Sequence, residues 1–266
     1  MRILQNGRTS LLATAVAASS GVAFAGGDSF TLTLLHNNDG ESKLISTSTS
    51  QPDFGSVARF ATVVANARAA APGGNSLLVT SGDNFLAGPE WNCGTQNGVP
   101  FLDSVALTEI GFDAFCLGNH DFDFGPDVLA QFIEGVANGA PFLSANLDFS
   151  AEANLAALEA AGRIAPSTVV EVGGRQIGIV GATTPNLPSI SSPGDVVVDP
   201  DVRAAVQAQI DALLADGVDI VILTSHLQSI GEDLALIPTL SGVDIAIAGG
   251  GDDLLFGGAG IDQVFG

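Results

Sequence analysis

The strongest constraint on the fold is the regular alternation of short apolar runs with segments whose apolar residues have helical spacing. The predicted strands cover residues 30–36, 77–80, 113–117, 141–147, 168–172, 176–180, 218–224 and 243–248, and the predicted helices cover residues 54–71, 100–110, 126–137, 152–162, 200–215 and 231–240. This alternation predicts an α/β fold with a largely parallel sheet, and the tight hairpin at 168–180 makes the sheet mixed. The nearly continuous apolar run at 218–224 is expected to be a central strand. Residues 85–98, around the only tryptophan, are expected to form a loop.

Polar side chains follow five of these strands, where a parallel sheet gathers the carboxyl ends of its strands. They are Asp39 with Glu41, Asp83 with Asn84, Asn119 with His120 and Asp121, then His226, and finally Asp252 with Asp253. Ligands of open α/β sheets bind at this edge. Carboxylate, amide and imidazole groups suit divalent metals, and ligands from several strands suit a two-metal site for phosphoryl transfer. The structural alternatives are a turn residue at Asp39, a helix cap at Asp83 and a buried structural histidine at His226.

Residues 1–25 have the pattern of a secretory signal peptide. Arg2 and Arg8 precede the apolar run 11–18, and Ala23-Phe24-Ala25 gives an A-x-A cleavage site. The alternative, a membrane anchor, needs a longer apolar span. A secreted or periplasmic protein without a membrane segment after cleavage is therefore expected.

The chain is strongly acidic, with 29 Asp and Glu against 8 Lys and Arg and a net charge of −21. Removal of Arg2 and Arg8 with the signal would leave six basic residues and a net charge of −23. Such a surface argues against nucleic acid as a partner. An anionic substrate would need cations in its binding site.

The two cysteines, Cys93 and Cys116, leave two alternatives open. In an exported chain they can form a disulfide. Otherwise Cys116, which lies inside an apolar strand, is a small core residue with a free thiol.

The stretch LGNHDFDFG at 117–125, taken with the other strand-end residues, resembles the calcineurin-like metallophosphoesterases. The resemblance is closest to the N-terminal catalytic domain of secreted 5′-nucleotidases and runs from about Leu32 to Asp253. That family has D-x-H, G-D, G-N-H-[DE], a lone His and G-H-x-[HQ] in this order. The resemblance implies a sandwich of mixed β-sheets flanked by helices over residues 26–248.

The resemblance also implies roles at the matching positions. Asp39 would bind a first metal, Asp83 would bridge two metals, and Asn119 and His226 would bind the second. His120 would stabilise the phosphoryl charge or protonate the leaving oxygen, with Asp121 holding its ring. The nucleophile would be a hydroxide held by the two metals.

Two motifs depart from the family pattern. Glu41 stands where the family has His, which shifts the preference from zinc towards manganese, magnesium or calcium. Gly251 stands where a His would complete the second metal. Asp253 stands where the family has His or Gln and is a further candidate ligand of the first metal.

The tail at 249–266 is rich in Gly and Asp and allows two interpretations. It approximates two turns of the calcium-binding nonapeptide repeat of RTX proteins, with Asp253 and Asp262 at the repeat's Asp position. About three repeats are needed for a stable stack, so the alternative is a glycine-rich loop of the metal site.

The resemblance implies an exported phosphoesterase with two divalent metals, which acts on small phosphate monoesters and most naturally on nucleotides. One alternative is a catalytically impaired calcium-binding protein on the same fold. Another is a fragment without the C-terminal domain that grips the nucleoside in 5′-nucleotidases.

Overall fold

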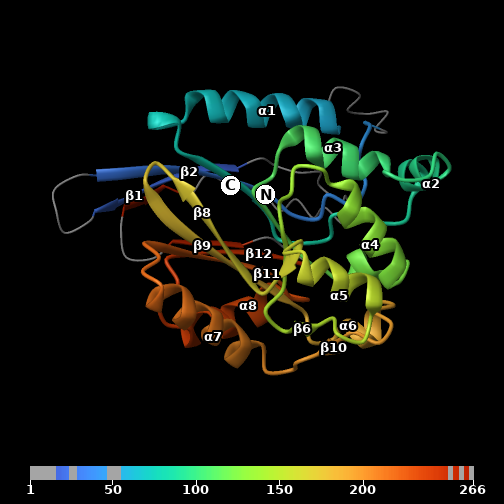
Figure 1. Cartoon of the computed structure of the whole chain (residues 1–266). Helices are drawn as coiled ribbons and strands as arrows, with labels where there is room; N and C mark the ends of the chain where they lie inside the picture. The colour runs from blue at the N-terminus through green and yellow to red at the C-terminus, as the bar shows by residue number, and fades with distance from the viewer. Residues whose placement is uncertain (1–15, 24–28, 47–54, 251–253, 258–260, 264–266) are drawn as a thin grey trace, which may run out of the picture.

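The structure, a computed structural model, describes residues 16–23, 29–46, 55–250, 254–257 and 261–263, and within these ranges two β-sheets lie between helices (Figure 1). The first sheet has the order β14 (Ile261–Gln263), β1 (Val16–Ala23), β2 (Ser29–Asn37), β3 (Ser76–Thr80), β4 (Ala114–Cys116), β5 (Phe142–Leu143) and β7 (Ile164–Ala165). The second has the order β13 (Leu254–Gly257), β12 (Ile245–Gly249), β11 (Ile220–His226), β9 (Arg175–Thr183) and β8 (Ser167–Val172). A small pair joins β6 (Leu147–Asp148) to β10 (Val197–Val198).

The helices cover the outer faces of the sheets. They are α1 (Val57–Ala70), α2 (Pro89–Thr95), α3 (Leu102–Ile110), α4 (Pro126–Gly135), α5 (Ala153–Ala160), α6 (Leu187–Ile190), α7 (Val202–Ala215) and α8 (Ile230–Leu236), with 3₁₀ turns at Pro72–Gly74, His120–Phe122 and Ile237–Thr239. Figure 1 shows α1 and α3 above the first sheet and α7 and α8 below the second. The predicted mixed α/β architecture is confirmed, because β2, β3, β4, β5 and β7 of the first sheet run parallel while β8 and β9 form the antiparallel hairpin.

Alternate side chains of the strands enter different cores. Leu77 and Val79 of β3 pack in a buried cluster with residues of the second sheet, whereas Leu78 between them packs with the helices. Adjacent residues of β11 also enter different cores, since Ile222 packs against the first sheet and Leu223 packs with α7. Because both faces of these strands are covered, their sequences are continuous apolar runs. As predicted, β11 is central, between β9 and β12.

Three predicted boundaries are corrected. Residues 85–98 are not a loop, because they contain α2, which begins at Pro89, a residue suited to the first helical position. The strand expected at 141–147 is two short strands in different sheets, β5 and β6. The helix expected at 231–240 becomes a 3₁₀ turn at 237–239, where Pro238 removes an N–H donor.

Two predictions concern the ends of the chain, the signal peptide at 1–25 and the repeat tail at 249–266, and both stay predictions. Strand β1 falls inside the predicted signal peptide and pairs antiparallel with β2, while residues 1–15 and 24–25 lie outside the described residues. Within the predicted repeat tail, β13 pairs with β12 and β14 pairs with β1, but Gly251, Asp252 and Asp253 lie outside the described residues. No helix among the described residues has the length and apolarity needed to cross a membrane.

The two cysteines are free thiols. Cys116 is buried in β4 and Cys93 is exposed on α2. The structure therefore has the second alternative, a core thiol, and not the disulfide.

Candidate metal centre

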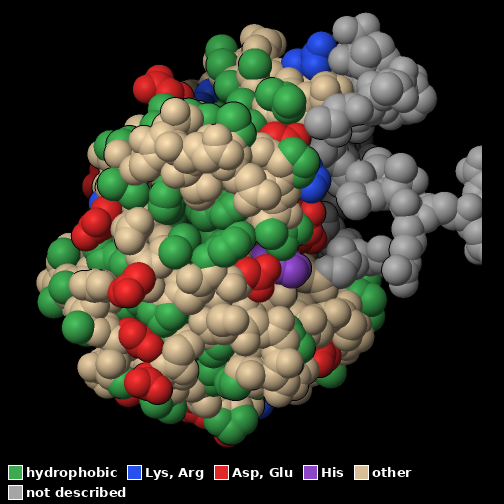
Figure 2. All heavy atoms as spheres, turned by 90° about the vertical axis from the view of Figure 1, so that its right-hand side faces the viewer, with side chains coloured by type: hydrophobic (Ala, Val, Ile, Leu, Met, Phe, Trp, Pro, Cys, Tyr) green, Lys and Arg blue, Asp and Glu red, His purple; other side chains and the backbone are tan. Residues whose placement is uncertain are grey.

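The predicted strand-end residues meet where the carboxyl ends of the two sheets come together. Asp39 and Glu41 follow β2, Asp83 follows β3, and His226 is the last residue of β11. Figure 2 shows a histidine side chain beside acidic side chains on this face of the molecule. The topology thus brings together residues up to 187 positions apart in the chain, from Asp39 to His226.

Two glycines allow the loops to approach this closely. A Cβ atom at Gly82 would clash with the His226 ring, and one at Gly118 would clash with the Asp83 carboxylate. Asp83 itself has a φ of 51°, a left-handed conformation that few non-glycine residues adopt. Backbone strain of this kind concentrates at functional sites, and here it directs the Asp83 carboxylate towards His226.

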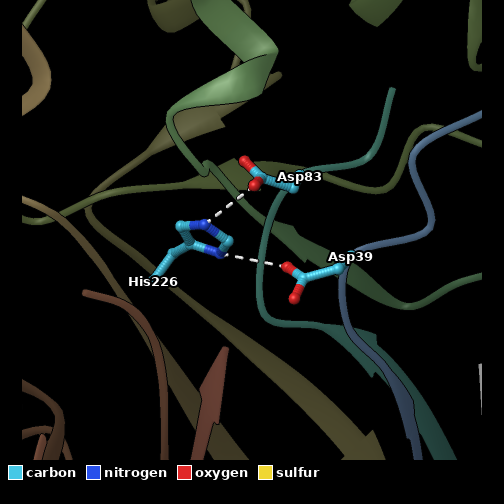
Figure 3. Close-up of side chains that lie close together, drawn as sticks. All are labelled: Asp39, Asp83 and His226. Atoms are coloured by element: carbon cyan, nitrogen blue, oxygen red, sulfur yellow. Dashed lines mark ion pairs between the residues drawn. The ribbon is translucent and has the colours of Figure 1, made fainter. Parts of the chain in front are cut away.

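Asp39, Asp83 and His226 form the inner group, whose ligand atoms lie within 4.8 Å of one another (Figure 3). Nε2 of the fully buried His226 is 3.1 Å from Oδ2 of Asp83, and Nδ1 is 3.9 Å from Oδ1 of Asp39. Nδ1 also lies 2.6 Å from the carbonyl oxygen of Ser81. Because a carbonyl only accepts, we infer that Nδ1 carries the proton and donates, which leaves Nε2 as the metal-binding atom.

The charges of the inner group hold a proton where a metal would bind. Burial lowers the pKa of His226, but Asp83 and Asp39 outweigh it and raise that pKa to about 9. Burial likewise opposes ionisation of Asp83, yet His226 and His120 bring the pKa of Asp83 below its ordinary value. In the absence of metal the pair is imidazolium and carboxylate, and metal binding has to release the proton on Nε2.

Glu41, Asp83 and His120 form the outer group, again with ligand atoms within 4.8 Å of one another. The backbone N–H of His120 donates to Oδ1 of Asp83 at 2.8 Å, and the His120 Nε2 atom is 4.0 Å from Oδ2 of Asp83. Nδ1 of His120 lies 2.6 Å from Oδ2 of Asp123, whose other oxygen accepts from the Ser191 hydroxyl at 2.8 Å. Asp83 therefore belongs to both groups, as a bridging carboxylate would.

The predicted partner of the His120 ring is wrong, since Asp123 and not Asp121 holds it. Residues 120–122 form a 3₁₀ turn, in which residues three apart lie on the same side and adjacent residues do not. Asp121 is instead fully buried and accepts from Asn84 N and Nδ2, both at 2.9 Å, and from Gly118 N at 2.8 Å. Burial and the nearby Asp83 raise the pKa of Asp121 to about 7. Asp121 thus ties together the loops that carry Asp83 and Asn84 on one side and Gly118 on the other.

Asn119 lies at the same edge, with its Oδ1 atom accepting from Nε2 of Gln228 at 3.0 Å. Gln228 follows β11 two residues after His226, so this contact joins the loops of the two sheets. Sequence reasoning missed Gln228 and Asp123; the H-x-x-D spacing of the 3₁₀ turn was the available signal for Asp123. Asp253 lies outside the described residues and remains a predicted ligand.

Divalent cations fit this donor set. Nε2 of His226 is buried, accepts no hydrogen bond from the described residues and faces the carboxylate of Asp83 at 3.1 Å. Carboxylates with an imidazole suit borderline cations, and the ring's other nitrogen is fixed by a backbone carbonyl, as is usual for a metal-binding histidine.

The layered architecture and the two groups that share Asp83 define a calcineurin-like metallophosphoesterase fold. The phosphoesterase YfkN of Bacillus subtilis, described as calcineurin-like, superposes with a TM-score of 0.64 at 19% identity, covering 88% of this chain and 72% of that one. The fold class predicted from the sequence is therefore confirmed.

More similar relatives are 5′-nucleotidases, although no protein-family model matches the chain. The chain is 33% identical over 236 residues to the 5′-nucleotidase of Diplobatis ommata, which covers 86% of this chain. It superposes on the 5′-nucleotidase precursor of Thermus thermophilus with a TM-score of 0.72 and 36% identity over 83% of this chain. The chain spans 39% and 41%, respectively, of the lengths of these two proteins.

Proposed function

We propose that this chain is an exported metal-dependent phosphoesterase that hydrolyses phosphate monoesters, with nucleotides as its substrate class. The observation that carries the proposal is the position of Asp83, whose carboxylate belongs to both the inner and the outer group. The similarity to proteins named 5′-nucleotidase supports nucleotides as substrates. The signal-like residues 1–25 support export.

Two divalent cations would be held by residues from both sheets. Asp39, His226 and Asn119 would be ligands, Asp83 would be shared by the two cations, and Glu41 would supply a further carboxylate. When bound, the cations neutralise phosphate charge and supply Lewis-acid activation. Glu41 in place of the family's His favours manganese, magnesium or calcium over zinc.

His120 is the proposed acid of the reaction. Burial lowers the pKa of His120, but Asp123 and Asp83 outweigh this effect and raise it above the ordinary value. The imidazolium form is therefore favoured, and Asp123 fixes the ring through Nδ1 at 2.6 Å. With Nδ1 held in this way, Nε2 is the atom that would donate a proton to the leaving oxygen or a hydrogen bond to the phosphoryl group.

The acidic surface makes the cations necessary for substrate binding as well. A chain with a net charge of −21 repels a phosphate dianion. The inner and outer groups add three carboxylates at the site itself. Bound cations would reverse the sign of this local field, so substrate affinity should depend on metal.

The test is phosphate release from p-nitrophenyl phosphate and from AMP. The full chain is stripped of metal with a chelator and then supplied with manganese, zinc, magnesium or calcium in turn. Asp83→Asn is assayed beside Glu159→Gln, which removes an exposed carboxylate of α5 far along the chain from the site. Metal-dependent release that is lost in Asp83→Asn and kept in Glu159→Gln supports the proposal.

Absence of release with every metal, from a chain that is folded by circular dichroism, would refute the proposed activity and favour a metal-binding protein without catalysis. Release from p-nitrophenyl phosphate without any preference for AMP would refute the nucleotide assignment alone. N-terminal sequencing of the protein recovered outside the cytoplasm tests export, with a new terminus after Ala25 as the expected result.

A further inference from the structure

A pocket lies beside the metal centre, between α1, α3 and the loop that follows β2. It is a hollow of about 600 Å³ that includes open solvent. Figure 1 shows α1 and α3 next to each other over the first sheet. Gly40 and Asn84, which adjoin metal-site residues, line the pocket, but no member of the inner or outer group does. The pocket therefore borders the metal-site loops without being part of the metal centre.

Most of the pocket wall is apolar. The walls are provided by Leu44 of the loop, Val57 and Phe60 of α1, Leu107 of α3, and Phe112. The rings of Phe60 and Phe112 are stacked, with centroids 6.2 Å apart and planes inclined by 23°. Such walls suit the apolar body of a ligand.

Asp103, in the first turn of α3, is the acidic side chain of this lining, which also contains the polar residues Asn37, Ser42, Lys43, Ser56 and Asn84. It is only 2% exposed, and among the described residues no donor forms a hydrogen bond of normal geometry with either carboxylate oxygen. Burial raises the pKa of Asp103, and the side chain of Ser42 offsets only part of that effect. A buried carboxylate that only the Ser42 side chain and its own backbone help to offset is costly, and side chains of this kind are kept paired in most proteins.

The nearest cation in the pocket wall is committed elsewhere. Lys43 also lines the pocket, but its Nζ atom lies 3.8 Å from Oε2 of Glu41, a member of the outer group. No ion pair joins Asp103 to a basic side chain within the described ranges. A bound ligand with a positive charge could therefore supply the counter-charge that the described residues do not give Asp103.

We propose that this pocket binds a small ligand that combines an apolar body with a protonated amine, and that Asp103 provides the counter-charge. The apolar walls hold the body of the ligand, and the ammonium group donates hydrogen bonds to the Asp103 carboxylate. The ligand would lie against Gly40, between two candidate metal ligands of the loop after β2.

Benzylamine and benzyl alcohol are a matched pair of probes, because they share the ring and differ in charge. Their binding is measured by saturation-transfer NMR titration and by the shift in unfolding temperature, on the full chain. A hydrogen bond to a charged group contributes roughly 1.5–3 kcal/mol, so benzylamine should bind at least about 10-fold more tightly than benzyl alcohol. Neither readout involves catalysis, so failure here leaves the proposed phosphoesterase function untouched.

Three variants test the assignment to this pocket. Asp103→Asn should abolish the preference for the amine and raise the unfolding temperature of the ligand-free protein. Glu109→Gln, an exposed carboxylate on the same helix, should leave the preference unchanged. Ala106→Leu, which fills the pocket and keeps the carboxylate, should weaken both probes. Equal affinity for the two probes in the unaltered chain, binding of neither, or an unchanged preference in Asp103→Asn would overturn the proposal.

Discussion

The inner and outer groups share Asp83 but differ in the parts of the molecule that build them. The inner group needs both sheets, because Asp39 and Asp83 follow strands of the first sheet and His226 ends a strand of the second. The outer group takes Glu41, Asp83 and His120 from the first sheet alone. The inner group can therefore form only when the two sheets have packed together.

Burial differs between the two histidines. The His226 side chain is fully buried, whereas that of His120 is 34% exposed. The carboxylates that are not shared are alike, with Asp39 28% exposed and Glu41 23% exposed. Interactions between charges are strongest where water is excluded. The comparison assigns metal retention mainly to the inner group and contact with substrate mainly to the outer group.

The largest effect is expected from His226→Asn, which removes the inner group's imidazole. Removing a residue that only hydrogen-bonds to a metal ligand lowers metal affinity or activity by about 10- to 100-fold. Loss of the ligand itself should therefore reduce kcat/KM by about 10³-fold. Metal content by atomic emission should fall together with activity. If both metals and activity remain, the inner group is structural and the comparison fails.

His120→Asn should reduce kcat by about 10²-fold, because it removes a proton donor and not the metals. Metal content should stay equal to that of the unaltered chain. A variant that instead loses one metal would show that His120 is a ligand of the outer group.

Asp123→Asn should lower kcat by about 10-fold with little change in KM, because the His120 ring loses its charged partner. The pH profile of kcat should shift downwards, since the Asp123 carboxylate raises the pKa of His120.

Asp121→Asn provides the contrast. The Asp121 carboxylate accepts hydrogen bonds from N–H groups on both of its oxygens. In the variant an amide NH₂ group would replace one oxygen and face N–H donors, so the free energy of unfolding should fall by roughly 1–3 kcal/mol. Urea unfolding measures this difference. A loss of kcat without a loss of stability would restore Asp121 as the partner of His120.

Glu41→His restores the family's residue in the outer group. The total rate with the best metal should change by less than about 10-fold, while the preference should move from manganese or magnesium towards zinc. Activity assays across the four metals measure the shift. An unchanged metal preference would show that Glu41 does not act as a ligand.

The smallest effect concerns Asp233, a buried residue of α8 that accepts from the Ser225 hydroxyl at 2.7 Å. Burial raises the pKa of Asp233 from 3.8 to about 6 in the folded chain. The folded state therefore binds the proton of Asp233 more tightly than the unfolded state does. As the pH rises from about 4 to about 6, ionisation of this carboxyl lowers the free energy of unfolding.

Asp233→Asn should remove this pH dependence and stabilise the chain above pH 6 by roughly 1–2 kcal/mol, after allowance for solvent screening. Unfolding in urea at pH 4 and pH 8 gives the difference, with the exposed Asp216→Asn as control. A stability difference that is the same at both pH values would contradict the assignment.

The sequence by itself determined the alternation of the main strands and helices and the chemistry at the strand ends. A strand that is apolar on both faces, such as the run at 218–224, is expected in the centre of a sheet. This run forms most of β11, which lies between β9 and β12. Asp39, Asp83 and His226 were predicted as one site because parallel strands deliver their carboxyl ends to a common edge.

Only the tertiary structure decided which neighbour each polar group contacts. Asp121 and Asp123 are both acidic and two residues apart, and the 3₁₀ turn at 120–122 sends one into the interior and the other to the His120 ring. The tautomer of His226 likewise depends on the Ser81 carbonyl, 145 positions away. Periodicity sets the face of an element on which a residue lies, but partners across elements depend on turn geometry and packing, which local sequence does not encode.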